Sequence, residues 1–184
     1  ILMRQVYLII LLFIFFPLAC TTVEVQMKYN GLRRYRPRRI GINLRESALS
    51  RIQSKFAKTK FVNISRAYAP YARMTWKRPY STRIARRYGS TRRWLFRVVF
   101  PRLMRRYRLD AIFYITFASQ QRTTTRYITN TGSYKTRYTY RCFYCYLINR
   151  WGGVIVKMRI CNDSSNGYGV ARNAFFNNLT DYLK

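Results

Sequence analysis

The sequence contains no histidine and only 5 acidic residues among its 184. Enzymes use histidine most often for general acid–base chemistry, and paired carboxylates are the usual alternative. The acidic residues stand singly along the chain, at Glu24, Glu46, Asp110, Asp163 and Asp181. The sequence also has no glycine-rich loop of the kind that cradles phosphates. We therefore expect no catalytic site and no enzyme activity.

The lack of histidine also bears on metal binding. The chain has four cysteines, Cys20, Cys142, Cys145 and Cys161. Cys142 and Cys145 have the spacing of a zinc or redox pair, but a site made only of thiolates would need both distant cysteines as well. Small buried residues in a helix are the simpler interpretation, because free cysteine is often simply buried. We expect no metal and no cofactor.

The few acidic residues leave the chain's positive charge unbalanced. Lysine and arginine total 36, which gives a formal net charge of +31, while hydrophobic residues make up 49% of the chain. Such a chain is too apolar for a disordered basic tail, and its self-repulsion calls for an anionic partner. Nucleic acid, an anionic membrane and an acidic protein are the candidates. Arginine mixed with 17 tyrosines and 12 phenylalanines favours RNA, where unpaired bases stack on rings and guanidinium groups.

The amino-acid composition gives a further indication of the chain's origin. Alanine, glycine and proline are few, whereas tyrosine, phenylalanine, isoleucine and asparagine are abundant, as in an AT-rich gene. The first residues are Ile1-Leu2-Met3. A trimmed chain, a tag remnant and a non-standard start codon are all compatible with this beginning. The composition and the first residues together favour a mitochondrial gene.

Residues 1–30 form an apolar N-terminal lead. The uncharged run at 6–20 has 15 residues, fewer than the roughly 20 that a membrane-spanning helix needs. An interfacial or membrane-inserted helix stays open for this run. The other interpretation is an apolar arm that packs against a neighbouring protein.

Residues 31–90 are predicted to form a basic arm with one short helix. The stretch "GLRRYRPRRIG" at 31–41 is expected to lie extended on phosphates without burying a core. Hydrophobic residues at helical spacing predict an amphipathic helix from Asn43 to about Ala57, with Asn43 and Glu46 as a capping box. Residues 68–89 are expected to be an irregular connector. The candidate RNA-binding residues of this arm are Arg33, Arg34, Arg36, Arg38 and Arg39.

From residue 91 onward, the hydrophobic residues follow the periodicity of regular helices and strands. Ser90 is a suitable N-cap for a helix that runs to about Arg108, and Pro101 is expected to kink it. One side of this helix is apolar, with Leu95, Phe96, Val99, Phe100, Leu103 and Tyr107. Arg97, Arg105 and Arg108 lie on the opposite side. We therefore expect one side of the helix to pack on a sheet and the other to face a partner.

The segments that follow predict a small sheet. Residues 111–118 are apolar on both faces, as in a covered strand. Two strands rich in threonine and tyrosine follow on either side of Gly132, which supplies the positive φ of the turn. Arg126, Lys135, Arg137 and Arg141 of this hairpin are expected to face RNA. Residues 140–150 are predicted to be a second helix, 154–160 a strand, and 162–184 a weakly apolar tail. The result is an α+β fold with two helices on one face of a small mixed or antiparallel sheet.

Residues 91–161 resemble the C-terminal domain of the universal small-subunit ribosomal protein S-three. That family has a run of the form Arg-Arg-x-x-Phe-Arg in its first helix, matched by Arg92, Arg93, Phe96 and Arg97, and Arg102 continues it. A hairpin glycine follows, matched by Gly132. The family's closing pattern is matched by Trp151, Gly152, Val156, Lys157 and Ile160. The sequence departs from the family at Ser119–Arg122, where a glycine-rich bend would stand, and at Ile155, where a second glycine would.

The resemblance implies a structural protein that binds ribosomal RNA in the mitochondrial matrix. It places the chain in the head of the small subunit, where messenger RNA enters, and adds messenger RNA and neighbouring ribosomal proteins as partners. In that family the basic side of the first helix is implicated in unwinding message, and Arg97 and Arg102 inherit this role by position. Residues 1–90 lack the Gly-x-x-Gly loop of the family's KH domain. We therefore expect a separate chain to supply that domain.

A membrane-anchored accessory subunit of an inner-membrane respiratory complex is the alternative. Residues 6–20 would then be the anchor, and the basic groups would meet anionic lipid head groups. Lipid recognition needs only a cluster of basic residues near the membrane, whereas here arginine and tyrosine extend over the whole chain. This distribution favours RNA.

Overall fold

The computed structural model describes residues 22–32, 34–44, 46–129 and 132–183. For residues 46–48, 123–127, 129, 134–138 and 181 only the backbone is described. The strands are β1 (Val23–Asn30), β2 (Arg39–Ile42), β3 (Lys60–Asn63), β4 (Ala111–Thr129), β5 (Gly132–Asn149) and β6 (Val154–Asn162). The helices are α2 (Glu46–Gln53), α3 (Ser65–Trp76), α4 (Tyr80–Tyr88), α5 (Thr91–Trp94), η1 (Leu95–Val99), α6 (Phe100–Tyr107), α7 (Gly167–Asn177) and α8 (Thr180–Leu183). The α+β class is confirmed.

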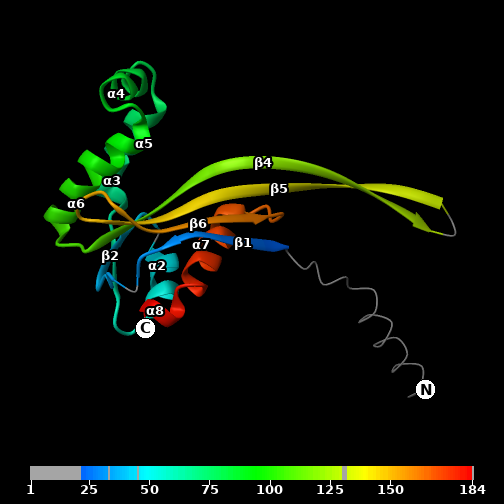
Figure 1. The fold of residues 1–184 in the computed structure, drawn as a ribbon, viewed down its shortest axis with the longest axis horizontal. Coiled ribbons are helices and arrows are strands. Elements are labelled where there is room, and N and C mark those ends of the chain that lie inside the picture. Colours follow the sequence, from blue (N-terminus) through cyan, green and yellow to red (C-terminus); the bar gives the residue numbers. More distant parts are fainter. Residues whose placement is uncertain (1–21, 33, 45, 130–131, 184) are drawn as a thin grey trace.

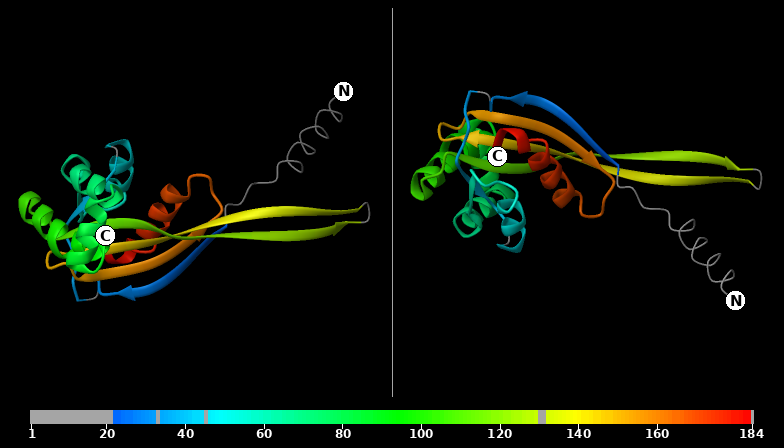
Figure 2. Two further views of the ribbon diagram at one scale, coloured as in Figure 1. Left: turned by 90° about the horizontal axis from the view of Figure 1, so that it is seen from above. Right: turned by 90° about the horizontal axis from the view of Figure 1, so that it is seen from below.

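The strands form one mixed sheet in the order β1-β6-β5-β4-β2-β3. β2 runs parallel to β3 and β4, while the other neighbours are antiparallel. β2 pairs with β4 only at Ala111 and Ile112, and β6 pairs with β5 only as far as Arg141. Among the described strands, the distal parts of β4 and β5 therefore pair only with each other, and this ribbon extends far beyond the packed part of the molecule (Figures 1 and 2).

Helices cover both faces of the sheet, so the packed part has three layers (Figure 1). One face packs against α2, α7 and α8, in a core that contains Phe56, Phe113 and Phe175. The other face packs against the helices from α3 to α6, in a core that contains Trp94, Phe100 and Ile148. The sequence predicted helices on only one face. The second covering layer comes from the C-terminal segment, which was predicted to be a tail.

The continuous helical segment α5–η1–α6 is the long helix that the sequence predicted. Ser90 caps it, because its side-chain oxygen accepts the Arg93 backbone N–H at 3.1 Å. Pro101 follows a π-helical turn in which the Phe100 backbone N–H donates to Leu95. A π turn is a common way for a helix to absorb a local disruption of its hydrogen bonding. The predicted apolar side is buried except for the half-buried Tyr107, and the predicted arginine side is exposed.

The prediction of a helix at 140–150 is wrong, because residues 140–149 belong to β5. β5 pairs with β4 on one side and with β6 on the other, so its backbone hydrogen bonds are satisfied within the sheet. Cys145 and Leu147 face one core, while Tyr146 and Ile148 face the other. A strand covered on both faces gives a continuous apolar run, and periodicity alone does not distinguish such a run from a buried helix.

Three other segments differ from their predictions. The arm at 31–41 does contribute to the core, because Leu32 and Ile40 are fully buried and β2 begins at Arg39. Residues 68–89 lie mainly in α3 and α4 rather than in an irregular connector. The tail forms α7 and α8, which bury Phe175 and Phe176. The short helix predicted from Asn43 to Ala57 is present as α2, over fewer residues.

Candidate nucleic-acid interface

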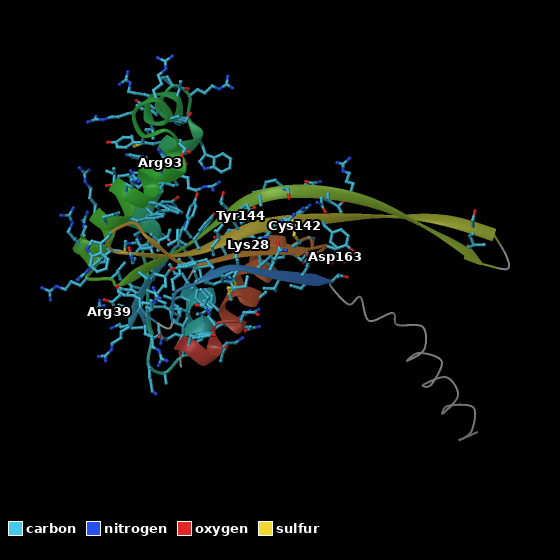
Figure 3. The ribbon with its side chains drawn as sticks, viewed as in Figure 1. Lys28, Arg39, Arg93, Cys142, Tyr144 and Asp163 are labelled. Carbon is cyan, nitrogen blue, oxygen red and sulfur yellow. A yellow bond between two sulfur atoms is a disulfide. The ribbon has the colours of Figure 1, made fainter. Side chains whose placement is uncertain are left out.

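The helices from α3 to α6 present a cationic surface, which we call the basic helix layer. Between Glu46 and Asp110 the chain contains no acidic residue. The layer's basic residues are all exposed: Arg66, Arg73, Lys77, Arg78, Arg83, Arg86, Arg87, Arg92, Arg93, Arg97, Arg102, Arg105, Arg106 and Arg108. Figure 3 shows basic side chains projecting from these helices away from the sheet, with Arg93 among them. The layer is therefore a single-sign surface suited to a polyanion.

The amphipathic pattern of the helices produces this arrangement. Tyr68 of α3, Ile84 of α4 and Trp94 of α5 are buried in the core that the layer shares with the sheet. Each of these anchors fixes its helix with the apolar side inward, so the intervening arginines point outward. Gly89 caps the C-terminus of α4, because its φ is +79° and its backbone N–H donates to the Ala85 carbonyl at 2.8 Å, as in a left-handed cap.

The sheet adds aromatic rings beside the layer, in a group that we call the tyrosine patch: Tyr114, Tyr144 and Tyr146, with Lys157. The rings of Tyr144 and Tyr146 are 6.1 Å apart, and those of Tyr114 and Tyr146 are 6.3 Å apart. The Lys157 Nζ lies 4.9 Å from the centre of the Tyr144 ring. Tyr114, Tyr144 and Lys157 are half-buried, whereas Tyr146 is 3% exposed and packs in the core beneath them. Only Tyr114 and Tyr144, beside the Lys157 cation, therefore offer aromatic surface of the kind on which unpaired bases stack.

Arg92 joins the two surfaces. Its Nη1 donates a hydrogen bond to the Tyr146 hydroxyl at 3.2 Å, and its guanidinium carbon lies 5.8 Å from the centre of that ring. Burial raises the pKa of Tyr146, and the charge of Arg92 opposes this shift in part. Burial likewise raises the pKa of Tyr114. Both phenols therefore stay neutral at physiological pH.

The structure brings together the predicted RNA-binding residues of the long helix. Arg92, Arg93, Arg97, Arg102, Arg105 and Arg108 all lie exposed on the basic helix layer. Sequence reasoning missed the arginines of α3 and α4 and the tyrosine patch. The arginines of α3 and α4 could have been predicted from the long stretch without acidic residues and from the helical spacing of Arg83, Arg86 and Arg87.

The other predicted residues lie elsewhere. Arg34, Arg36 and Arg38 are exposed, whereas Arg39 is half-buried and its Nη2 donates to the Tyr107 carbonyl at 3.4 Å. Arg33 lies outside the described residues. The Arg141 Nη1 donates to the Ser165 carbonyl at 3.0 Å, so this side chain also holds the turn before α7.

For the outer hairpin only the register of the predicted residues is described. Arg126 pairs with Lys135, and Arg137 pairs with Thr124. The predicted direction of these side chains toward RNA lies outside what the structure describes. Gly132 has a positive φ of +143° at the turn, as predicted.

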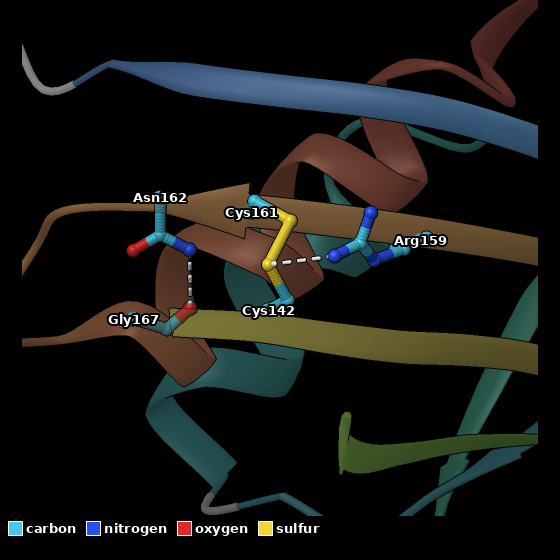
Figure 4. Close-up of a disulfide and its surroundings, with 5 residues drawn as sticks. All are labelled: Cys142, Arg159, Cys161, Asn162 and Gly167. Carbon is cyan, nitrogen blue, oxygen red and sulfur yellow. Dashed lines mark hydrogen bonds between the residues drawn. A yellow bond between two sulfur atoms is a disulfide. The ribbon is translucent and has the colours of Figure 1, made fainter. Parts of the chain in front are cut away.

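The three cysteines within the described residues do not converge on one site. Cys142 of β5 and Cys161 of β6 are paired residues joined by a disulfide, and an Arg159 Nη2 lies 3.5 Å from the Cys142 sulfur (Figure 4). Cys145 faces the core on the other side of the sheet and is fully buried. Among the described residues, no group of three potential metal ligands comes together. The same part of the chain contains no helix able to span a membrane, and the apolar run at 6–20 lies outside it.

Protein-family models, curated proteins and solved structures were all compared with this chain, and none of them matches it.

Proposed function

We propose that this chain is a structural RNA-binding protein of the mitochondrial small ribosomal subunit. The observation that carries the proposal is the basic helix layer, with its fourteen exposed lysine and arginine side chains and no acidic residue between Glu46 and Asp110. Phosphates of ribosomal RNA would neutralise this surface, and the release of their counterions would drive binding. The role is structural, because the layer offers positive charge and no arrangement of catalytic groups.

The kind of basic residue favours RNA over a membrane surface. Of the layer's fourteen basic residues, only Lys77 is a lysine. Arginine makes bidentate contacts with phosphate and stacks on bases, whereas attraction to lipid head groups requires only charge. In the neighbouring tyrosine patch, the half-buried Tyr114 and Tyr144 supply aromatic surface for bases.

The long ribbon of β4 and β5 also supports an RNA partner. From residue 132 to residue 140, β5 pairs only with β4 among the described strands. An isolated two-stranded ribbon is marginally stable in water, so a ribbon of this length calls for a partner along it. Arg122, Arg126, Lys135 and Arg137 belong to this ribbon, and it contains no acidic residue. Ribosomal RNA is an anionic partner large enough to surround it.

The most specific part of this proposal rests on the resemblance to ribosomal protein S-three. Three features support the resemblance: the hairpin turn at Gly132, the closing strand β6, and the capped helix whose exposed side carries Arg92, Arg93, Arg97 and Arg102. Against it is the strand at 140–150, where the family has a helix. On this basis the chain would lie in the head of the subunit, near incoming messenger RNA. A separate chain would supply the KH domain.

Sedimentation of lysed mitochondria in mild detergent tests the proposal. The chain, followed by mass spectrometry, should migrate with small-subunit ribosomal RNA and leave that fraction after ribonuclease treatment. Migration with respiratory complexes that ribonuclease does not alter would refute the proposal. It would instead support the membrane-anchored accessory subunit.

A further inference from the structure

A pocket lies where the basic helix layer meets the sheet. It lies between the end of α3, the start of α5 and β4, and has a volume of about 610 Å³. Trp76, Arg92 and Tyr114 line this cavity, together with the hydroxyl-bearing residues Thr75, Ser90 and Thr116. Its size is within the range of about 300–1,000 Å³ that is usual for small-ligand sites.

Trp76 is the unusual member of this pocket. Its side chain is 87% exposed, although tryptophan normally buries a large apolar surface. Trp76 is the last residue of α3, and it lines the pocket from that end. An exposed indole at the edge of a pocket offers a flat face on which another ring can stack.

Arg92 supplies charge on the other side of the pocket. Its hydrogen bond to the Tyr146 hydroxyl uses one N–H and holds the guanidinium group in place. A guanidinium group has five N–H donors, so others remain for a phosphate. The Thr75 hydroxyl donates to the Ala72 carbonyl at 2.7 Å, and the Ser90 oxygen accepts the Arg93 N–H at 3.1 Å. Thr75 can therefore still accept, and Ser90 can still donate, a hydrogen bond to the edge of a base or to a ribose hydroxyl.

We propose that this pocket holds one unpaired nucleotide of ribosomal RNA. The base stacks on the Trp76 indole, and the Arg92 guanidinium group binds the adjacent phosphate. This inference rests on the proposed function, which supplies the RNA, and goes beyond it by assigning a site for a single-stranded segment. The surrounding arginines bind phosphates of any RNA, whereas a stacking site requires an unpaired base.

The test compares single-stranded and duplex RNA of equal length, each with a fluorescent label, for binding to the full chain. Trp76→Ala should weaken single-stranded binding by about 5- to 150-fold, which corresponds to the roughly 1–3 kcal/mol of one base–aromatic stack. Duplex binding should stay within about twofold. Trp151→Ala is the matched control, because Trp151 is 65% exposed, lies outside the pocket and has Arg150 over its ring at 4.4 Å.

Equal losses for the two RNAs, or no loss for either, would overturn the stacking site while leaving the RNA-binding function intact. If the unsubstituted chain binds neither RNA, the proposed function itself fails, and the site fails with it. Ultraviolet cross-linking in purified small subunits identifies the nucleotide. Trp76 should be linked to one position of ribosomal RNA, and links scattered over many messages would contradict the ribosomal assignment.

Discussion

The carboxylate of Asp110 accepts the backbone N–H of Arg39 at 2.9 Å, and the same oxygen accepts that of Arg38 at 2.9 Å. Asp110 lies between α6 and β4, and its own backbone N–H donates to the Arg39 carbonyl at 2.9 Å. These bonds fix the start of β2 beside the start of β4. One of the few acidic residues therefore holds a basic segment in the sheet.

Asp110→Asn should destabilise the fold by about 1–3 kcal/mol, because hydrogen bonds to a charged acceptor are stronger than those to a neutral one. Urea unfolding followed by circular dichroism measures the change. Asp163→Asn makes the same change of charge in the turn before α7 and is the control, with an expected effect within about 0.5 kcal/mol. Equal effects of the two substitutions would show that net charge, and not the bonds to β2, sets the difference.

The glycine of the β5–β6 turn packs directly against the basic helix layer. Gly152 has a φ of +82°, and a Cβ there would collide with the Phe96 carbonyl oxygen. Gly152→Ala should therefore cost about 2–5 kcal/mol, from the left-handed backbone and from the collision. Thermal unfolding measures this loss.

Gly89→Ala is the control that separates these two causes. Gly89 has nearly the same φ, +79°, but a Cβ there would meet only the flexible end of Arg93. This substitution should cost about 1–2 kcal/mol, the backbone contribution alone. A Gly152→Ala variant no less stable than Gly89→Ala would refute the close packing of the turn against η1.

The buried Cys145 thiol should make the free energy of unfolding depend on pH in the alkaline range. Burial raises the pKa of the Cys145 thiol well above its ordinary value, so the folded chain keeps a proton that the unfolded chain loses. The free energy of unfolding should therefore fall as pH rises through the unfolded pKa, by about 1 kcal/mol between pH 7.5 and 9.5. Cys145→Ala should lose this part of the dependence. An identical pH profile for the two proteins, or rapid alkylation of Cys145 in the folded chain at pH 9, would contradict its burial.

The basic helix layer should determine the salt dependence of RNA binding. Replacing both Arg86 and Arg87 of α4 with glutamine should reduce the slope of log affinity against log salt by about 1.4–1.8, since each phosphate contact contributes about 0.7–0.9. Fluorescence anisotropy at several salt concentrations measures the slope.

The control for this measurement replaces the exposed residues Lys58 and Lys60 with glutamine. Both lie beside α8, where the Thr59 hydroxyl donates to the Leu183 carbonyl at 2.8 Å, away from the layer. Their replacement should change the slope by less than half as much. Equal slopes for the two double variants would indicate a diffuse attraction without a defined surface.

Local signals predicted the parts of the fold that depend on local chemistry. The Ser90 cap, the two-sided helix that follows it and the positive φ of Gly132 could all be read from neighbouring residues. The strand conformation of 140–149 could not be predicted in this way, because it depends on pairing with β4 and β6. The half-buried position of Arg39 could not be predicted either, because it depends on hydrogen bonds to Tyr107 and Asp110, which are distant in the sequence.

In the candidate site, too, features set by neighbouring residues could be predicted, whereas features set by tertiary packing could not. The arginines of the long helix were predicted because their helix has a clear apolar side. The tyrosine patch was not predicted, because Tyr114 and Tyr146 belong to different strands and come together only when the sheet forms. The sequence also gives no indication that Trp76 and Arg92 line one pocket, since that depends on how α3 and α5 pack.

Protein–RNA cross-linking in purified mitochondrial small subunits tests the central claim most directly. After ultraviolet irradiation and digestion, mass spectrometry identifies the peptides of this chain that carry nucleotides. We expect most of these peptides to come from residues 65–108, the basic helix layer, and others from the tyrosine patch on β4 and β5. An absence of nucleotides on the layer, although other proteins of the same subunits carry them, would contradict the account.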